Sequence, residues 1–172
     1  RGFAKVRIDG KYGLINKIGN EVISCSYDDV ELSFHNGLLL VSKNNKWGLI
    51  DETEKVIISF SYESAYSFDN GLFAIKNNGK WGLIDNAEKE IAPCIYDCLV
   101  HGFRDGLLEA WKNYGKGFID MTGKEVIPCI YNKVTGLTNG VIEVQKGYQS
   151  MKILKIGEQF TDAYEEIGDF TN

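Results

Sequence analysis

The chain has 172 residues, of which 44% are hydrophobic and 25% charged, and its formal net charge is −5. This composition is typical of a folded globular protein and excludes a disordered chain. The lysines are scattered rather than gathered into a basic stripe, so we expect no nucleic-acid partner. No apolar run reaches the roughly 18–20 residues that a membrane-spanning helix needs.

Three sequence markers recur with one common period. Each appears about every 34 or 35 residues, and all keep the same phase, which predicts five tandem units at residues 1–35, 36–69, 70–104, 105–138 and 139–172. The first marker is the pair Tyr12-Gly13, Trp47-Gly48, Trp81-Gly82 and Lys116-Gly117. The second is a tyrosine: Tyr27, Tyr62, Tyr96, Tyr131 and Tyr164. The third is a turn: Asn36-Gly37, Asn70-Gly71, Asp105-Gly106 and Asn139-Gly140.

Each unit opens with a strand that alternates apolar and polar residues, as in residues 71–76. This period predicts an antiparallel strand with one face buried and the other in water. A hairpin turn such as Asn78-Gly79 follows, then the Trp-Gly strand, a type I turn and a third short strand. In the second and third units Glu54 and Glu88 replace the glycine of the type I turn, so that turn must differ or tolerate strain. The prediction is an all-β chain of three-stranded units.

The glycine after each marker aromatic needs a reason, because glycine weakens a strand by about 0.5–1 kcal/mol. We expect a neighbouring aromatic side chain, the marker tyrosine for instance, to lie over the bare backbone. Trp47 and Trp81 are then packing wedges between units. The alternative is an exposed ladder of tryptophans that binds sugars or apolar peptides.

The fourth unit departs from the pattern. Lys116 stands where other units have an aromatic residue, and Trp111 appears five positions earlier, where other units carry Arg7, Ser42, Lys76 and Gln145. Either Trp111 folds across the hairpin to fill the gap, or it is exposed and contacts a partner. We therefore take Trp111, Tyr114 and Lys116 as candidate binding residues.

These motifs resemble those of the WG (or KWG) repeat family. The resemblance rests on Lys-Trp-Gly-Leu-Ile-Asp at 46–51 and 80–85, on Gly-Lys-Glu-Val-Ile-Pro at 123–128, and on the tyrosine followed by an acid. It covers almost the whole chain and is weakest in the fifth unit, as in a terminal capping repeat. It implies a bacterial interaction or structural module with no catalytic residues.

Residues capable of catalysis or metal binding do not form a recognisable site. His35 and His101 occupy different repeat positions, and neither has a partner at metal-ligand spacing. Cys25, Cys94 and Cys129 occupy one apolar repeat position. Cys98 adds only a Cys-x3-Cys pair with Cys94, and a disulfide between Cys94 and Cys129 would need neighbouring units to stack in register. We expect no enzyme activity, no metal and no cofactor.

Units of this size cannot each bury a core, so neighbours must stack. We favour an open twisted array over a closed five-unit, propeller-like ring, because propeller blades are usually longer. The leading hypothesis is a repeat module that binds protein or peptide within a larger bacterial protein. One alternative is glycan or cell-envelope binding through surface aromatics, and another is a structural or regulatory spacer attached to an enzyme. Because Arg1 lies inside a repeat strand, we expect a fragment, and both a cytoplasmic and a cell-surface location stay open.

Overall fold

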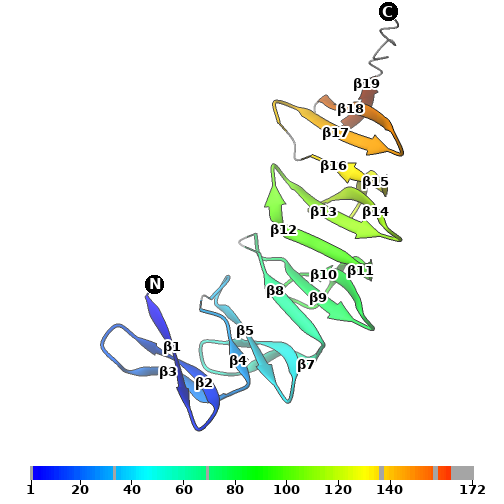
Figure 1. Ribbon diagram of the computed structural model, residues 1–172. Helices are drawn as coiled ribbons and strands as arrows, with labels where there is room; N and C mark the ends of the chain where they lie inside the picture. The colour runs from blue at the N-terminus through cyan, green and yellow to red at the C-terminus, as the bar shows by residue number, and fades with distance from the viewer. Residues whose placement is uncertain (1, 33, 69, 136–137, 157–158, 164–172) are drawn as a thin grey trace, which may run out of the picture. The chain divides into compact units, whose positions relative to one another are not determined.

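The computed structural model describes residues 2–32, 34–68, 70–135, 138–156 and 159–163. Over these residues the protein consists of β-strands and turns, without a helix (Figure 1). The all-β prediction is therefore confirmed. The chain divides into two compact units, Arg1–Ile95 and Tyr96–Asn172, which are described separately below. The single domain of five stacked units and the open array stay predictions.

The strands form five small antiparallel sheets that follow one another along the chain. The first sheet is β1 (Phe3–Ile8), β2 (Lys11–Asn16) and β3 (Glu21–Tyr27). The second is β4 (Asp29–Val30), β5 (Leu38–Lys43), β6 (Lys46–Asp51) and β7 (Val56–Tyr62). The third is β8 (Ser64–Ser67), β9 (Phe73–Asn77), β10 (Lys80–Ile84) and β11 (Glu90–Tyr96). The fourth is β12 (Cys98–Arg104), β13 (Leu107–Lys112), β14 (Gly115–Asp120) and β15 (Glu125–Tyr131). The fifth is β16 (Lys133–Val134), β17 (Val141–Lys146), β18 (Gln149–Ile156) and β19 (Gln159–Ala163).

Four of these sheets have four strands, where the sequence predicted three. In each of these four sheets the additional strand begins two residues after a marker tyrosine, as β4 does after Tyr27, and pairs with the following strand. The Asp28 N–H donates to the Ser42 carbonyl at 2.8 Å, and Val30 is buried. Alternation cannot identify β4 or β16, because each has only two residues. Four strands is the strand count of a propeller blade.

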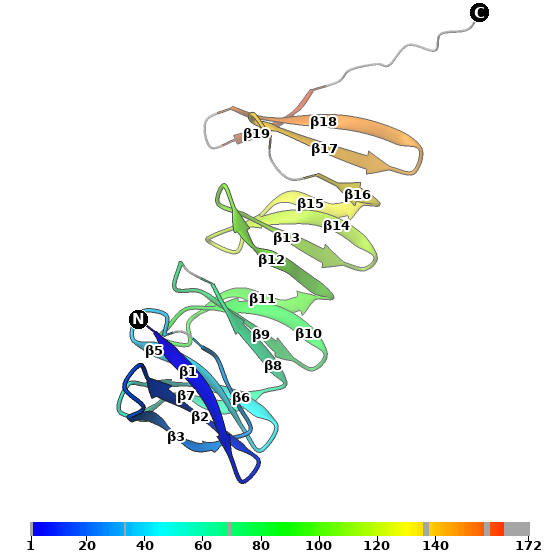
Figure 2. The ribbon, with the colours of Figure 1, turned by 60° about the vertical axis from the view of Figure 1, so that its left-hand side comes forward.

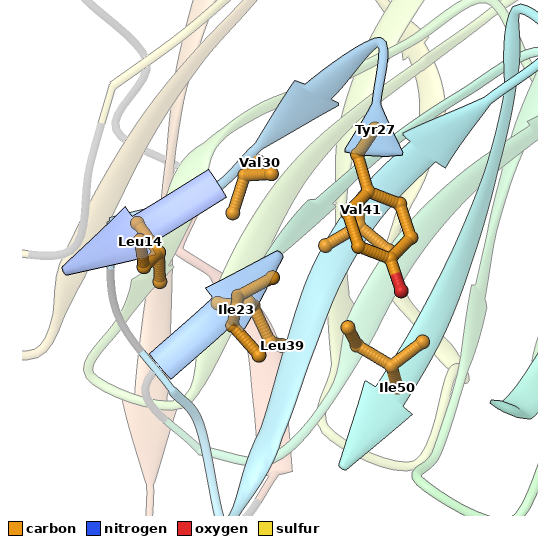
Figure 3. Packing of buried hydrophobic residues seen from close by; sticks show 7 residues of the cluster. All are labelled: Leu14, Ile23, Tyr27, Val30, Leu39, Val41 and Ile50. Atoms are coloured by element: carbon orange, nitrogen blue, oxygen red, sulfur yellow. The ribbon is translucent and has the colours of Figure 1, made fainter. Parts of the chain in front are cut away.

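The second sheet is buried on both faces. Leu39 and Val41 pack against Leu14, Ile23 and Tyr27 of the first sheet (Figure 3). The alternate residue Leu40 packs on its other face against the third sheet, and Ser42 is only 5% exposed. The prediction of a strand half in water is therefore wrong for β5, because face-to-face stacking leaves a central sheet no solvent face.

The marker glycines lie under the backbone of the next strand, and at Gly48 the ring of Phe60 also comes within 3.0 Å of where a Cβ would stand. A Cβ at Gly82 would stand 2.7 Å from the Ala92 carbonyl oxygen and 2.8 Å from the Cys94 nitrogen. At Gly48 it would stand 2.6 Å from the Ile58 carbonyl oxygen. The register of the β6–β7 ladder shifts between Trp47 and Leu49. Several residues of β7 therefore lie opposite the single residue Gly48, which is a β-bulge. The predicted close approach is present, but a β-bulge makes it.

Candidate functional site

The hairpin of each sheet ends in a two-residue turn whose second residue changes along the chain. In the first three sheets this second residue is Gly10, Asn45 and Gly79, and in the last two it is Tyr114 and Tyr148. Both tyrosine side chains are fully exposed to solvent. They are the most exposed of the large hydrophobic residues that the structure describes.

Tyr114 has a positive φ, the left-handed backbone conformation that glycine adopts most readily. Its φ is 67°, and the φ of Asn113 before it is 52°, as in a type I′ turn. A residue with a side chain pays about 1–2 kcal/mol for this left-handed region. In the fifth sheet the positive φ falls on Gly147 instead (62°). Tyr148 is therefore exposed without the backbone strain of a left-handed conformation.

The residue that follows each of the first four marker tyrosines accepts a hydrogen bond from the next hairpin turn. In the second unit of the structure, Asp97 Oδ2 accepts a hydrogen bond from the Asn113 N–H at 2.8 Å. Asn132 Oδ1 accepts one from the Gly147 N–H at 2.6 Å. Similar bonds join Asp28 to the Asn45 N–H and Glu63 to the Gly79 N–H, which belong to the second rather than the first residue of their turns. The acid after the tyrosine was a repeat marker in the sequence, but its role was not predicted because its partner lies 16 or 17 residues away.

Trp111 lies across the hairpin from Lys116. The two residues are direct partners in the β13–β14 ladder, and the Lys116 Nζ is 4.3 Å from the centre of the indole ring. The indole N–H donates to Glu109 at 2.7 Å. In the third sheet the same ladder position pairs Lys76 with Trp81 in the opposite order. Trp111 is half-buried and takes the first of its two expected arrangements, whereas Tyr114 is the exposed aromatic of this hairpin.

The other marker residues lie within or beside the core. Trp47 is half-buried against the cluster between the second and third sheets, and Trp81 lies 5.1 Å from the ring of Tyr66. Tyr12 and Tyr62 are half-buried, and Tyr27, Tyr96 and Tyr131 are buried. Gly13 and Gly117 are crowded by backbone as Gly48 and Gly82 are. Tyr164 lies outside the described residues.

A shallow polar hollow lies on one face of the fifth sheet. Glu143 is the direct ladder partner of Lys152, and Gln145 is the partner of Ser150, so these four side chains share one face. The hollow has a volume of about 270 Å³, and Lys133 and Thr135 of the neighbouring segment complete its polar rim. It ends next to the turn that carries Tyr148.

The described residues offer no metal centre, and burial lowers the reactivity of three of the four cysteine thiols. No group of three or more His, Cys, Asp and Glu side chains that could hold a metal ion occurs among them. The four cysteines are free thiols. Burial raises the pKa of Cys129 to about 11 and raises those of Cys94 and Cys98 as well, which keeps these thiols protonated and unreactive at neutral pH. In the part of the chain that the structure describes, no helix is long and apolar enough to cross a membrane.

Solved structures similar to this chain have low sequence identity. KlHsv2 with loop 6CD replaced by a Gly-Ser linker, a β-propeller-like structure, matches with a TM-score of 0.50 and 8% identity, over 94% of this chain and 61% of that one. A chain of the Saccharomyces cerevisiae Dbp5 assembly with Nup159 and Gle1 matches with a TM-score of 0.48 and 13% identity, over 94% and 58%. AztD of Citrobacter koseri matches with a TM-score of 0.42 and 8% identity, over 99% and 58%. This chain thus spans about 60% of the length of these structures. At 8% identity, the similarity to the KlHsv2 structure concerns the fold alone.

The sequence matches one family model repeatedly, whereas a comparison with curated proteins gave no match. The model is that of the WG-containing repeat, and it matches residues 12–47, 47–81, 81–111 and 117–149. These four segments cover most of the chain and follow the repeat of sheets described above. The chain therefore belongs to the WG-containing repeat family.

Proposed function

We propose that this chain is a non-catalytic interaction module that binds a protein or peptide through one edge of residues 96–172. We call this edge the tyrosine edge and define it as the β13–β14 and β17–β18 turns with Tyr114 and Tyr148. Both views show these two turns on the same side of the unit (Figures 1 and 2). Trp111 and Lys116 form the base of the first hairpin.

The observation that carries the proposal is the conformation of Tyr114. An aromatic side chain stands at positive φ in a position that takes glycine or asparagine in the first three sheets. It is fully exposed, so packing within this unit does not compensate for the backbone strain. Such a residue stabilises the fold less than glycine would, and contact with a partner supplies a reason for it.

The turns that carry both tyrosines are held in place before any partner binds. Asp97 and Asn132 accept hydrogen bonds from the turn N–H groups, so the two rings are displayed on ordered backbone. Little backbone entropy is then lost on binding, and tyrosine itself has only two side-chain torsions to order. Exposed aromatic residues of this kind dominate the energy of many interfaces.

Selection of displayed peptides tests this proposal. A library of random peptides is panned on the wild-type chain and, in parallel, on the double variant Tyr114→Gly/Tyr148→Asn, whose turns keep residues suited to their φ values. We expect peptides that are enriched on the wild type and not on the variant. The matched control is Ile18→Ala, which alters an exposed residue (80% exposed) within residues 1–95, away from the tyrosine edge. It should enrich the same peptides as the wild type. Equal enrichment on all three proteins would contradict the proposal.

Glycan binding is a second candidate, favoured by the polar hollow of the fifth sheet. Hydroxyl, amide, carboxylate and ammonium groups line it, and Tyr148 stands at its end, which together offer hydrogen bonds and an aromatic surface to a sugar. Titration with cell-wall oligosaccharides, followed by NMR, should then shift the Gln145 and Ser150 amides. An unchanged spectrum at millimolar sugar would remove this candidate.

A further inference from the structure

We infer that the open edge of β1 binds residues 164–168 of a second copy of this chain, which add to the first sheet as its fourth strand. This inference concerns an edge within residues 1–95 and is independent of the tyrosine edge. It comes from three observations: the strand that the first sheet lacks, the register that this strand keeps in the other sheets, and the sequence of residues 164–168.

The first sheet has three strands, whereas each of the other four sheets has four. The strand it lacks is the one at the outer edge of β1, where no hydrogen bond from another described residue is made. Val6 of β1 is only half-buried, although the residues at its position in the other sheets are buried. An edge strand with free N–H and C=O groups is a template for pairing with another strand. The buried residues at the position of Val6 are Val41, Ile75, Ala110 and Val144.

The short strand keeps one register in all four sheets that have it. The residue directly after the marker tyrosine donates its N–H to a carbonyl of the following strand at 2.7 to 2.9 Å, as Asp28 does to Ser42. The residue three past the tyrosine is apolar and lies opposite the position of Val6, as Val30 lies opposite Val41. The other three pairs are Ala65–Ile75, Leu99–Ala110 and Val134–Val144. By this register, β1 accepts an N–H at the Arg7 carbonyl and an apolar residue opposite Val6.

Residues 164–168 have the sequence of such a strand. They read Tyr-Glu-Glu-Ile-Gly and lie outside the described residues. The fifth marker tyrosine is followed at once by an acid and, three positions on, by a β-branched apolar residue, as Tyr27 is by Asp28 and Val30. The shared register then places Ile167 opposite Val6.

The same register places Glu166 opposite Arg7. Arg7 is exposed and makes no ion pair with a described residue, whereas the two lysines of its hairpin are paired with Asp28 and Asp29. Opposite charges directly across a ladder stabilise strand pairing, and like charges oppose it. The charges therefore favour this segment on this edge.

Glu165 fits the hairpin turn of the first sheet. In the third sheet the N–H of Gly79 donates to Glu63 at 3.0 Å, and Gly10 holds the position of Gly79, with φ of 82° and 74°. The Gly10 N–H has no acceptor among the described residues. Asp9, the one acid of residues 2–11, opposes Glu165 at this turn. Asp9→Asn should therefore strengthen the contact.

One chain thus carries both halves of the contact, the edge of β1 and residues 164–168. Because these two surfaces differ, contact between copies is head to tail and can continue to a third copy.

Sedimentation velocity of the 172-residue chain tests the inference. We expect self-association that increases from micromolar to millimolar concentration. Ile167→Asp puts a charge opposite Val6 and should weaken association at least tenfold. The matched control Thr171→Asp adds the same charge beyond the two pairs that all four short strands share, and should change association less than twofold. Circular dichroism checks that each variant is folded.

Charge exchange identifies the two partners. Arg7→Glu alone and Glu166→Arg alone each put like charges opposite one another and should weaken association about fivefold. An equimolar mixture of these two variants should associate more strongly than either variant alone, because the edge of the first then meets an opposite charge on the segment of the second. The double variant should associate as the wild type does.

Three results would overturn the inference. The first is a chain that stays monomeric up to millimolar concentration. The second is association that Ile167→Asp leaves unchanged, which would place the contact elsewhere on the chain. The third is a mixture of the two charge variants that associates no better than each alone, since Arg7 and Glu166 would then not be partners.

Discussion

The hydroxyl of Tyr27, at the end of the first sheet, donates a hydrogen bond to Glu54 Oε2 of the second sheet at 3.0 Å. The N–H and the hydroxyl of Ser24 donate to the same carboxylate at 3.0 and 2.8 Å. Glu54 stands at φ 63° in a turn where the first unit has Gly19. The strain anticipated from the sequence is therefore present, and the three hydrogen bonds that tie two sheets together offset it.

Replacing this glutamate by glycine should have different effects in the second and third sheets. Glu54→Gly relieves about 1 kcal/mol of backbone strain but removes three hydrogen bonds to a carboxylate, so we expect a net loss of about 1–2 kcal/mol. Glu88 also has positive φ (61°), but among the described residues its carboxylate accepts a hydrogen bond from the Tyr62 hydroxyl alone, at 2.9 Å. Glu88→Gly should therefore stay within about 0.5 kcal/mol of the wild type. Urea unfolding measures both; equal losses would show that the carboxylate bonds do not stabilise the contact.

Stability should fall at alkaline pH. Burial, together with the Glu54 carboxylate, raises the pKa of Tyr27 from 10.0 to about 12, and the pKa values of Tyr62 and Tyr96 are also raised, by burial and by Glu88 and Glu125. The folded state thus holds a proton that the unfolded state releases near pH 10. The contribution is complete below pH 10 and is lost as the pH rises through about 12. Unfolding free energies measured from pH 8 to 12 should be flat and then decline, and Tyr27→Phe should decline less.

Adding a methyl group should be far more harmful at Gly82 than at Gly79. At Gly82 the new Cβ would meet the backbone of β11 at 2.7 Å, so Gly82→Ala must displace a strand and should cost about 3 kcal/mol or more. A Cβ at Gly79 would meet no atom of the described residues within 4 Å, but φ there is 74°, so Gly79→Ala should cost about 1 kcal/mol. Thermal unfolding of the two variants compares them directly. A mild effect at Gly82 would mean that the bulge can move away.

The order of Trp111 and Lys116 across the hairpin should be exchangeable. Trp111→Lys alone places two lysines directly opposite each other and removes the ring, so it should destabilise the chain by about 1 kcal/mol. Adding Lys116→Trp recreates the order of Lys76 and Trp81 in the third sheet and should return stability to within about 0.5 kcal/mol of the wild type. Chemical unfolding of the single and double variants gives the coupling energy. Additive losses would show that the two side chains act independently.

Glycine should have opposite effects on stability at the two exposed tyrosines. Tyr114→Gly removes strain at φ 67° and should stabilise the chain by about 1 kcal/mol. Tyr148→Gly acts at a position without positive φ, where added freedom of the unfolded chain should cost about 0.5–1 kcal/mol. Differential scanning calorimetry should show the melting temperature rising for the first and falling for the second. A fall for Tyr114→Gly would mean that the ring stabilises the fold through a contact of its own.

The local features of this fold could be predicted from the sequence. The all-β class, the repeat and the family follow from markers that recur every 34 or 35 residues. The hairpin turns also follow, since Asp9 and Gly10 both have the positive φ that Asp-Gly favours (50° and 82°). These features depend on residues that are neighbours in the chain, and sequence patterns record such neighbours directly.

Tertiary structure decided what depends on residues far apart. The short strand β4, the second buried face of β5 and the bulge over Gly48 all result from sheet pairing and stacking, which alternation in one strand does not reveal. The roles of Glu54 and Asp97 arise in the same way, because their partners lie 27 to 30 and 16 residues away. The sequence drew attention to Trp111, the conspicuous departure from the repeat. The structure shows that residue half-buried against Lys116 and leaves Tyr114 exposed, because Trp111 has a ladder partner whereas Tyr114 stands in the turn beyond the last pair of the β13–β14 ladder.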